Sequence, residues 1–99
     1  MKFITNYKEL SGNSDESLLD HISEKTIEKK DDVLKYLKNG EDDGVRCSGI
    51  FDYVSGEPTF ETIHLFTDGK YCWDSEEIYH FEKYNLRLND DFIEYVLSR

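Results

Sequence analysis

The sequence predicts an α+β fold, in which helices and a β-sheet occupy separate parts of the chain. Apolar residues recur at helical spacing between residues 14 and 40. Residues 45–73 are instead rich in β-forming side chains and are divided by turn sequences, and helical spacing returns after residue 74. The predicted architecture is N-terminal helices, a three-stranded antiparallel meander and two C-terminal helices. A length of 99 residues fits one domain, covering residues 1–99.

The N-terminal helices are expected to follow a polar turn at residues 11–13. Ser14 is a candidate N-cap, with Asp15 and Glu16 next to it at the positive end of the helix dipole. A second helix, or a continuation of the first, is expected over residues 26–38. Asn39-Gly40 is typical of a C-cap, and residues 41–44 are predicted to form a loop.

The meander is predicted to contain strands at residues 45–54, 60–66 and 70–73. Its first turn is expected at residues 55–58, from their composition. Its second turn is expected at Asp68-Gly69, because Asp-Gly between alternating apolar segments indicates a tight hairpin. Large side chains on both faces of the second strand indicate that the sheet packs on more than one surface.

The two C-terminal helices each have a candidate N-cap. Asp74, with Glu77 three residues later, fits a reciprocal capping arrangement. Asn89 is expected to cap the last helix. The buried stripe of that helix is predicted to consist of Phe92, Ile93, Val96 and Leu97.

The net charge of the chain is −10, from 22 acidic and 12 basic residues. Residues 1–40 contribute −1 and residues 41–99 contribute −9. A negative field of this kind repels nucleic acid and anionic membranes, so neither is an expected partner. The charge either maintains solubility or steers a basic protein partner. We expect a cytoplasmic protein, because no apolar run has the length of a signal peptide or a membrane span.

Catalytic and metal sites are not indicated by the spacing of histidine and cysteine. The two cysteines, Cys47 and Cys72, are expected to be free thiols. A small enzyme that uses Cys72 or a histidine is an alternative, although a strand cysteine beside Trp73 is more often a small buried hydrophobe. The sequence therefore predicts a protein that is not an enzyme and needs no metal or cofactor.

A protein-binding surface is the remaining interpretation. Five tyrosines exceed the need of a small core: Tyr53, Tyr71, Tyr79, Tyr84 and Tyr95. Tyrosines rimmed by acids are typical of protein interfaces, although the same rings could instead cover the edge of the core. We expect the acids beyond Gly40 to gather on one exposed side, and we assign Trp73 to the core. The candidate partner-binding residues are Asp52, Glu57, Glu61, Asp68, Tyr71, Asp74, Glu76 and Tyr79.

Residues 65–96 carry a pattern of an aliphatic strand, T-D-G, an aromatic residue, any residue and tryptophan, followed by an acidic helix start. An aromatic pair, K-Y, a short linker and a last helix with phenylalanine near its start follow. Together with VLKYLKNG at 33–40, this pattern resembles small bacterial immunity-type proteins of toxin systems; other proteins with the pattern have no assigned role. The resemblance implies neutralisation of a basic toxin domain, with no turnover and no cofactor. The alternative is a small structural or regulatory domain that forms a homodimer.

Overall fold

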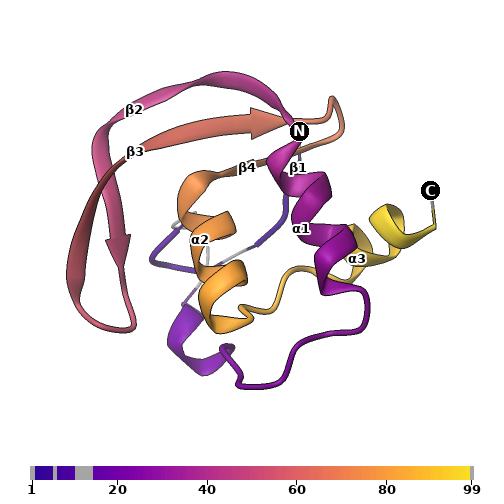
Figure 1. Cartoon of the computed structure of the whole chain (residues 1–99), viewed down its shortest axis with the longest axis horizontal. Helices are drawn as coiled ribbons and strands as arrows, with labels where there is room; N and C mark the ends of the chain where they lie inside the picture. The colour runs from indigo at the N-terminus through magenta and orange to yellow at the C-terminus, as the bar shows by residue number, and fades with distance from the viewer. Residues whose placement is uncertain (1, 6, 11–14, 99) are drawn as a thin grey trace.

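The computed structural model describes residues 2–5, 7–10 and 15–98, and leaves out the side chains of residues 46–48. The elements are β1 (Lys2–Phe3), the 3-10 turn η1 (Leu18–Asp20), α1 (Lys30–Lys38), β2 (Glu41–Asp52), β3 (Glu57–Thr67), β4 (Tyr71–Asp74), α2 (Ser75–Tyr84) and α3 (Asp90–Leu97). The three helices pack together beside β1 and β4, while β2 and β3 extend beyond them (Figure 1). The predicted α+β class is confirmed.

The sheet has four strands among the described residues, in the order β1-β4-β3-β2. Strands β2, β3 and β4 form the predicted antiparallel meander. Strand β1 adds a parallel partner to β4, with Lys2 opposite Tyr71, and the sheet is therefore mixed. The sequence did not predict this strand, which is only two residues long and has no periodicity of its own.

The two turns of the meander differ in how well the sequence located them. Asp68-Gly69 forms the predicted turn: the Asp68 carboxylate accepts hydrogen bonds from the N–H groups of Lys70 and Tyr71, and Gly69 has φ 94°. The other turn lies at residues 53–56, and β3 already begins at Glu57. The predicted turn at 55–58 therefore lies two residues too late in the chain. The physical reason is that the Asp52 carboxylate accepts from the N–H groups of residues 54 and 55 and so starts the turn earlier.

The predicted N-terminal helices are largely wrong. Of the first, only η1 forms, capped by Ser17, whereas Ser14 lies outside the described residues. This segment bonds instead to the preceding chain, where Lys8 N–H donates to the carbonyl of Glu16. The second helix does not begin until Lys30, because Lys29 has a left-handed backbone with φ 61°. Helices are therefore concentrated toward the C-terminus.

The predicted C-terminal end of α1 at Asn39 is confirmed. The predicted loop at 41–44 is wrong, because Glu41 pairs with Thr67 and Asp42 with Phe66 as the first residues of β2. Strand pairing with β3 outweighs the turn-forming composition of residues 41–44.

The main core is formed where α1, α2 and α3 meet β4 and Ile4. Trp73 lies at its centre, 2% exposed, and its Nε1–H donates to the carbonyl of Leu37 at 3.0 Å. A Cβ atom at Gly40 would lie 2.5 Å from the Trp73 ring, so glycine is needed there to admit the indole. The assignment of Trp73 to the core is confirmed.

The C-terminal helices form as predicted. Asp74 and Glu77 make the reciprocal capping arrangement at the start of α2. In α3, Phe92 and Val96 are buried and Ile93 packs against the core. The prediction that Leu97 belongs to the buried stripe is wrong, because this residue ends the helix and is 37% exposed. Within the described part of the chain, none of the helices combines the length and apolar character that crossing a bilayer requires.

Candidate protein-interaction site

The acidic hairpin is the name used here for β2, β3 and the turn between them, residues 41–67. It holds six acidic residues and one basic residue, a net charge of −5. Figure 1 shows it extending past the helices and curving, so that its turn comes back toward the end of α2. Its exposed acids are Glu41, Asp42, Asp43, Glu57 and Glu61. The element is therefore both prominent and negatively charged.

A groove of about 500 Å³ lies between the acidic hairpin and the helices. Glu61, His64 and Phe66 of β3 line one side of it, and Tyr79 and Glu82 of α2 line the other. Tyr79 and Phe66 are half-buried and Glu61 is exposed. The groove thus combines aromatic rings with carboxylates, the chemistry expected of a surface for a basic protein. Lys38 also lines it and forms an ion pair with Glu82 at 2.9 Å.

The predicted partner-binding residues fall into three groups by exposure. Glu57 and Glu61 are exposed, and Asp68 and Tyr79 are half-buried. The other four are buried, with exposed fractions between 2% and 5%: Asp52, Tyr71, Asp74 and Glu76. The expected placement of these four on a contact surface is corrected, since their side chains are committed to contacts inside the fold. The structure brings together Glu61 and Tyr79, which both line the groove.

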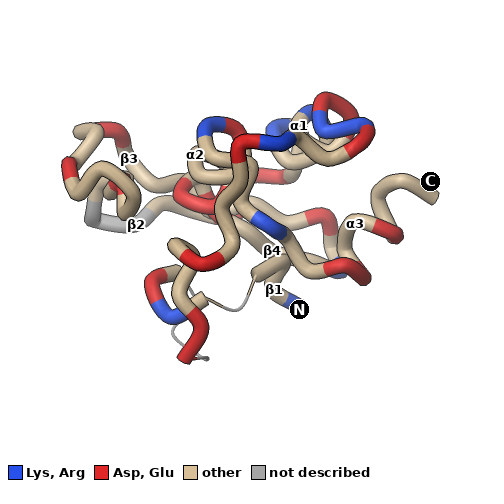
Figure 2. The backbone as a smooth tube through the Cα atoms, turned by 90° about the horizontal axis from the view of Figure 1, so that it is seen from below, with Lys and Arg blue, Asp and Glu red and all other residues tan. Residues whose placement is uncertain are grey.

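The acids beyond Gly40 do not gather on one side. Figure 2 shows Asp and Glu along the acidic hairpin, through α2 and at the start of α3. Asp90 and Asp91 lie in the first turn of α3, where the helix dipole stabilises them, and Asp90 forms an ion pair with Arg87 at 3.2 Å. The expectation of a single acidic face is therefore wrong. The acidic hairpin is the part of the molecule where exposed acids still lie close together.

Asp52 is buried because it attaches the turn of the acidic hairpin to α2. Its carboxylate accepts hydrogen bonds from the hydroxyl groups of Tyr79 at 2.7 Å and Tyr84 at 2.6 Å, in addition to the two backbone N–H groups of the turn. The Lys83 ammonium lies 3.6 Å away. Desolvation by burial alone would raise the pKa of Asp52, but the hydrogen bonds from Tyr84, Ser55, Tyr79 and Val54 outweigh it and lower the pKa well below its usual range.

Two other side chains of α2 complete this attachment. A carboxylate oxygen of Glu76 accepts from Phe51 N–H at 3.0 Å. His80 is fully buried, and its Nδ1 lies 2.7 Å from the backbone carbonyl of Glu76 while Nε2 accepts from Tyr53 N–H at 3.1 Å. Because a carbonyl can only accept, the proton is on Nδ1. Helix α2 thus supplies acceptors to the end of β2.

Phe60 is the residue of the acidic hairpin that sequence reasoning missed. It is 91% exposed and has a left-handed backbone with φ 65°. The hairpin register shifts here, because Gly49 pairs with Thr62 whereas Phe51 pairs with Pro58. The β3 strand therefore bulges around Phe60 and points its ring into solvent. The Glu-Pro-Thr-Phe-Glu composition carries no signal for a bulge at this position.

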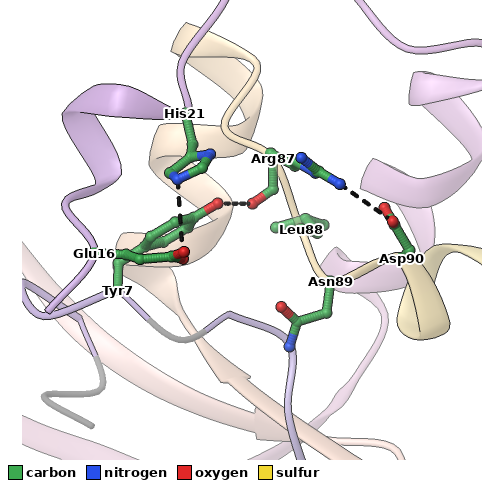
Figure 3. Close-up of a pocket in the computed structure, with 7 residues that line it drawn as sticks. All are labelled: Tyr7, Glu16, His21, Arg87, Leu88, Asn89 and Asp90. Carbon is green, nitrogen blue, oxygen red and sulfur yellow. Dashed lines mark hydrogen bonds and ion pairs between the residues drawn. The ribbon is translucent and has the colours of Figure 1, made fainter. Parts of the chain in front are cut away.

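A second, polar pocket of about 280 Å³ lies between the N-terminal segment and the α2–α3 linker (Figure 3). Its polar side chains lie in pairs: His21 lies 3.9 Å from the Glu16 carboxylate, and Arg87 bonds to Asp90. The Tyr7 hydroxyl donates to the carbonyl of Arg87. Burial raises the pKa of Tyr7 to about 12, with Arg87 opposing and Glu16 adding to the rise. A phenol with this pKa stays protonated at neutral pH, so the Tyr7 hydroxyl keeps the hydrogen bond that joins the N-terminal segment to the α2–α3 linker.

Cys72 is half-buried on β4. Desolvation by burial raises the pKa of its thiol, and the nearby Glu77 carboxylate raises it further. The thiolate, which is the nucleophilic form, is therefore disfavoured at neutral pH. The side chain of Cys47 lies outside the part of the chain that the structure describes. Among the described residues, no group of three or more His, Cys, Asp or Glu is arranged to hold a metal ion.

No family model, curated protein or solved structure matches this chain.

Proposed function

We propose that this protein is a non-catalytic acidic binding module that docks a basic protein partner through the acidic hairpin. The observation that carries the proposal is the net charge of −5 on an element that projects from the helices and borders a groove lined by Tyr79 and Glu61. A negative surface of this kind accelerates encounter with a positive one and disfavours partners of like charge. The resemblance to immunity-type proteins adds a class of partner, the basic domain of a bacterial toxin.

The test is affinity capture from the source organism with two matched variants. Glu57→Gln/Glu61→Gln removes two exposed charges from the acidic hairpin, and Asp31→Asn/Asp32→Asn removes two exposed charges from the start of α1. We expect a basic protein to be retained by the wild type and by the α1 variant, and to be lost from the hairpin variant. We also expect its loss when salt rises from about 0.1 M to 1 M, where the screening length falls to about 3 Å. Equal retention by both variants would contradict the proposal.

A self-associating domain is a second candidate, favoured by the exposure of Val45 at 60% and Phe60 at 91% on one hairpin. Two copies each carry −10, however, so their encounter is opposed by charge. Sedimentation velocity in low and high salt separates the two functions. We expect a monomer at low salt, and a dimer that forms there would favour self-association.

A further inference from the structure

Phe60 differs from the other phenylalanines in its exposure. Phe81 and Phe92 are at most 1% exposed in the core, and Phe3 is 47% exposed. At 91%, almost the whole Phe60 ring is in water, where a large apolar side chain contributes little to folding. Isolated apolar residues on a surface are ordinary, so exposure alone does not assign a role to this ring.

The backbone of Phe60 supplies the second observation. A bulky residue at φ 65° is a conformational outlier, because its Cβ crowds the neighbouring carbonyl. Glycine or asparagine would adopt this conformation at lower cost. The strain at Phe60 thus opposes local stability, and its hydrated ring adds almost no burial to offset that cost. Positions that break local rules in this way are concentrated at functional sites.

The bulge that presents Phe60 is held by specific contacts. The Thr59 hydroxyl donates to the carbonyl of Ile50 at 3.1 Å and accepts from Glu61 N–H at 3.3 Å. Across the hairpin, a Cβ atom at Gly49 would lie 3.3 Å from the Glu61 carbonyl, so the small residue permits close approach. The backbone that carries the ring is therefore set in advance of binding, which reduces the entropy lost when a partner covers the ring.

From this geometry we infer that Phe60 is the apolar anchor of the interface, inserting into a hydrophobic pocket rimmed by Lys and Arg on a basic protein partner. The inference rests on the proposed function and specifies the surface that the partner must offer. Glu57 and Glu61, both exposed, lie on either side of Phe60 in the chain and meet the basic rim. Residues 57–67 contain no lysine or arginine that would repel it. A second copy of this chain is disfavoured as the occupant, since each copy carries −10.

Site-specific crosslinking identifies the occupant. The photoreactive residue p-benzoylphenylalanine replaces Phe60 in the full chain inside the source organism, and Leu19, which is 49% exposed on η1, is replaced in a matched control. We expect a basic protein to crosslink through position 60 and not through position 19. Crosslinking no greater than the control, or crosslinking to a second copy, would overturn the inference.

Binding of the purified crosslinked protein then separates the anchor from the charges. Phe60→Ala should weaken affinity by about 30-fold or more, mainly through faster dissociation, as for a central aromatic anchor. Phe60→Leu should restore most of it, because the pocket is apolar. Glu57→Gln/Glu61→Gln should instead slow association at low salt. Far-UV circular dichroism and Trp73 fluorescence verify that each variant is folded.

The possible results separate the role of Phe60 as an anchor from docking through the acidic hairpin. Binding within twofold of wild type for Phe60→Ala, with weakened binding for the charge variant, overturns the anchor and leaves the proposed function intact. Unchanged binding for both variants overturns the anchor and the proposed function together. Loss of binding for both variants, with rescue by leucine, supports both.

Discussion

Asp52 joins the turn of the acidic hairpin to α2 through a single carboxylate. Four hydrogen bonds and a neighbouring ammonium stabilise its charged form, although only 2% of the residue is exposed. Hydrogen bonds to a charged acceptor are worth about 1.5–3 kcal/mol each when one partner is removed. The carboxylate therefore holds the curvature of the hairpin, and with it the groove between β3 and α2.

Asp52→Asn should lower the free energy of unfolding at pH 7 by about 2 kcal/mol, since the charge is lost while the shape is kept. Because the folded-state pKa of Asp52 lies below its unfolded value of about 3.9, its contribution is present above that pH and is lost as the pH falls. The stability difference between wild type and variant should thus shrink from pH 5 downward. Urea unfolding at several pH values, followed by Trp73 fluorescence, measures it, with Asp31→Asn as the exposed control. A difference independent of pH would contradict this account.

Phe60→Asn should stabilise the folded protein by up to about 1 kcal/mol, because a left-handed backbone costs a bulky L-residue about 1–2 kcal/mol and asparagine tolerates it. Phe60→Ala keeps the strain and should stay within about 0.5 kcal/mol of wild type. Chemical denaturation of the three proteins decides this. A loss of more than about 1 kcal/mol in the asparagine variant would show that the ring contributes packing, against its exposure.

Helix α2 is the element on which the candidate site depends, and its first residues determine where it begins. The Asp74 carboxylate accepts from Glu77 N–H at 3.1 Å, and the Glu77 carboxylate accepts from Asp74 N–H at 3.1 Å. Both residues are buried, so water cannot replace these bonds readily. The start of the helix in turn places Glu76, Tyr79 and His80 against the acidic hairpin.

Asp74→Ala should destabilise the protein by about 1–2 kcal/mol, as expected for loss of an N-cap. Asp31→Ala removes an exposed first-turn acid from α1 and should cost about 0.3–1 kcal/mol through the dipole alone. Thermal unfolding of both variants checks the order. Equal losses would show that the capping arrangement is not the source of stability.

Local patterns in the sequence predict the elements whose hydrogen bonds are local. The Asp68-Gly69 turn, the capping of α2 and the order β2-β3-β4 belong to this class. By contrast, β1 and the adjoining Ile4 depend on contacts far along the chain: Lys2 N–H donates to the carbonyl of Lys70 at 3.1 Å, and Asn89 N–H donates to the carbonyl of Ile4 at 2.8 Å. The first predicted helix failed because a backbone bond from Lys8, in the preceding segment, to the carbonyl of Glu16 replaces helical bonds.

The candidate site was predicted in part, and its errors share a physical origin. Glu57, Glu61 and Tyr79 are exposed or half-buried as a contact residue requires. Asp52 and Glu76 were expected on the surface because they are charged, but donors 25 or more residues away in the chain satisfy them in the interior. No local pattern encodes such pairs. Phe60 was missed because a bulge follows from the register of two strands.

At the scale of the whole molecule, the acidic hairpin is an arch supported at its two ends. At one end, residues 65–67 of β3 pair with both β2 and β4. At the other end, the turn is bonded to α2 through Asp52, Glu76 and His80. Between these supports, the described residues give β2 a single strand partner, β3, and the register of that pair shifts between Val45 and Gly49. Stability is therefore lowest in the middle of the arch.

Amide hydrogen exchange should show this distribution. Residues 65–67 should be the best protected part of the acidic hairpin, and residues 45–49 should exchange faster. In Asp52→Asn, the protection of the turn amides at residues 53–55 should be lower than in the wild type. The protection of residues 65–67 should fall only by the amount that global stability falls. Uniform protection along the hairpin would indicate that it opens as one cooperative unit with the helices.

The bond between Ile4 and Asn89 also has a consequence for biosynthesis. Ile4 leaves the ribosome well before Asn89, yet its place in the core exists only when β4, α2 and the linker up to Asn89 have emerged. The core around Ile4 therefore stays open until the residues up to Asn89 have been translated. A partner made in the same cell would meet a newly synthesised copy whose core closes only after Asn89 has emerged.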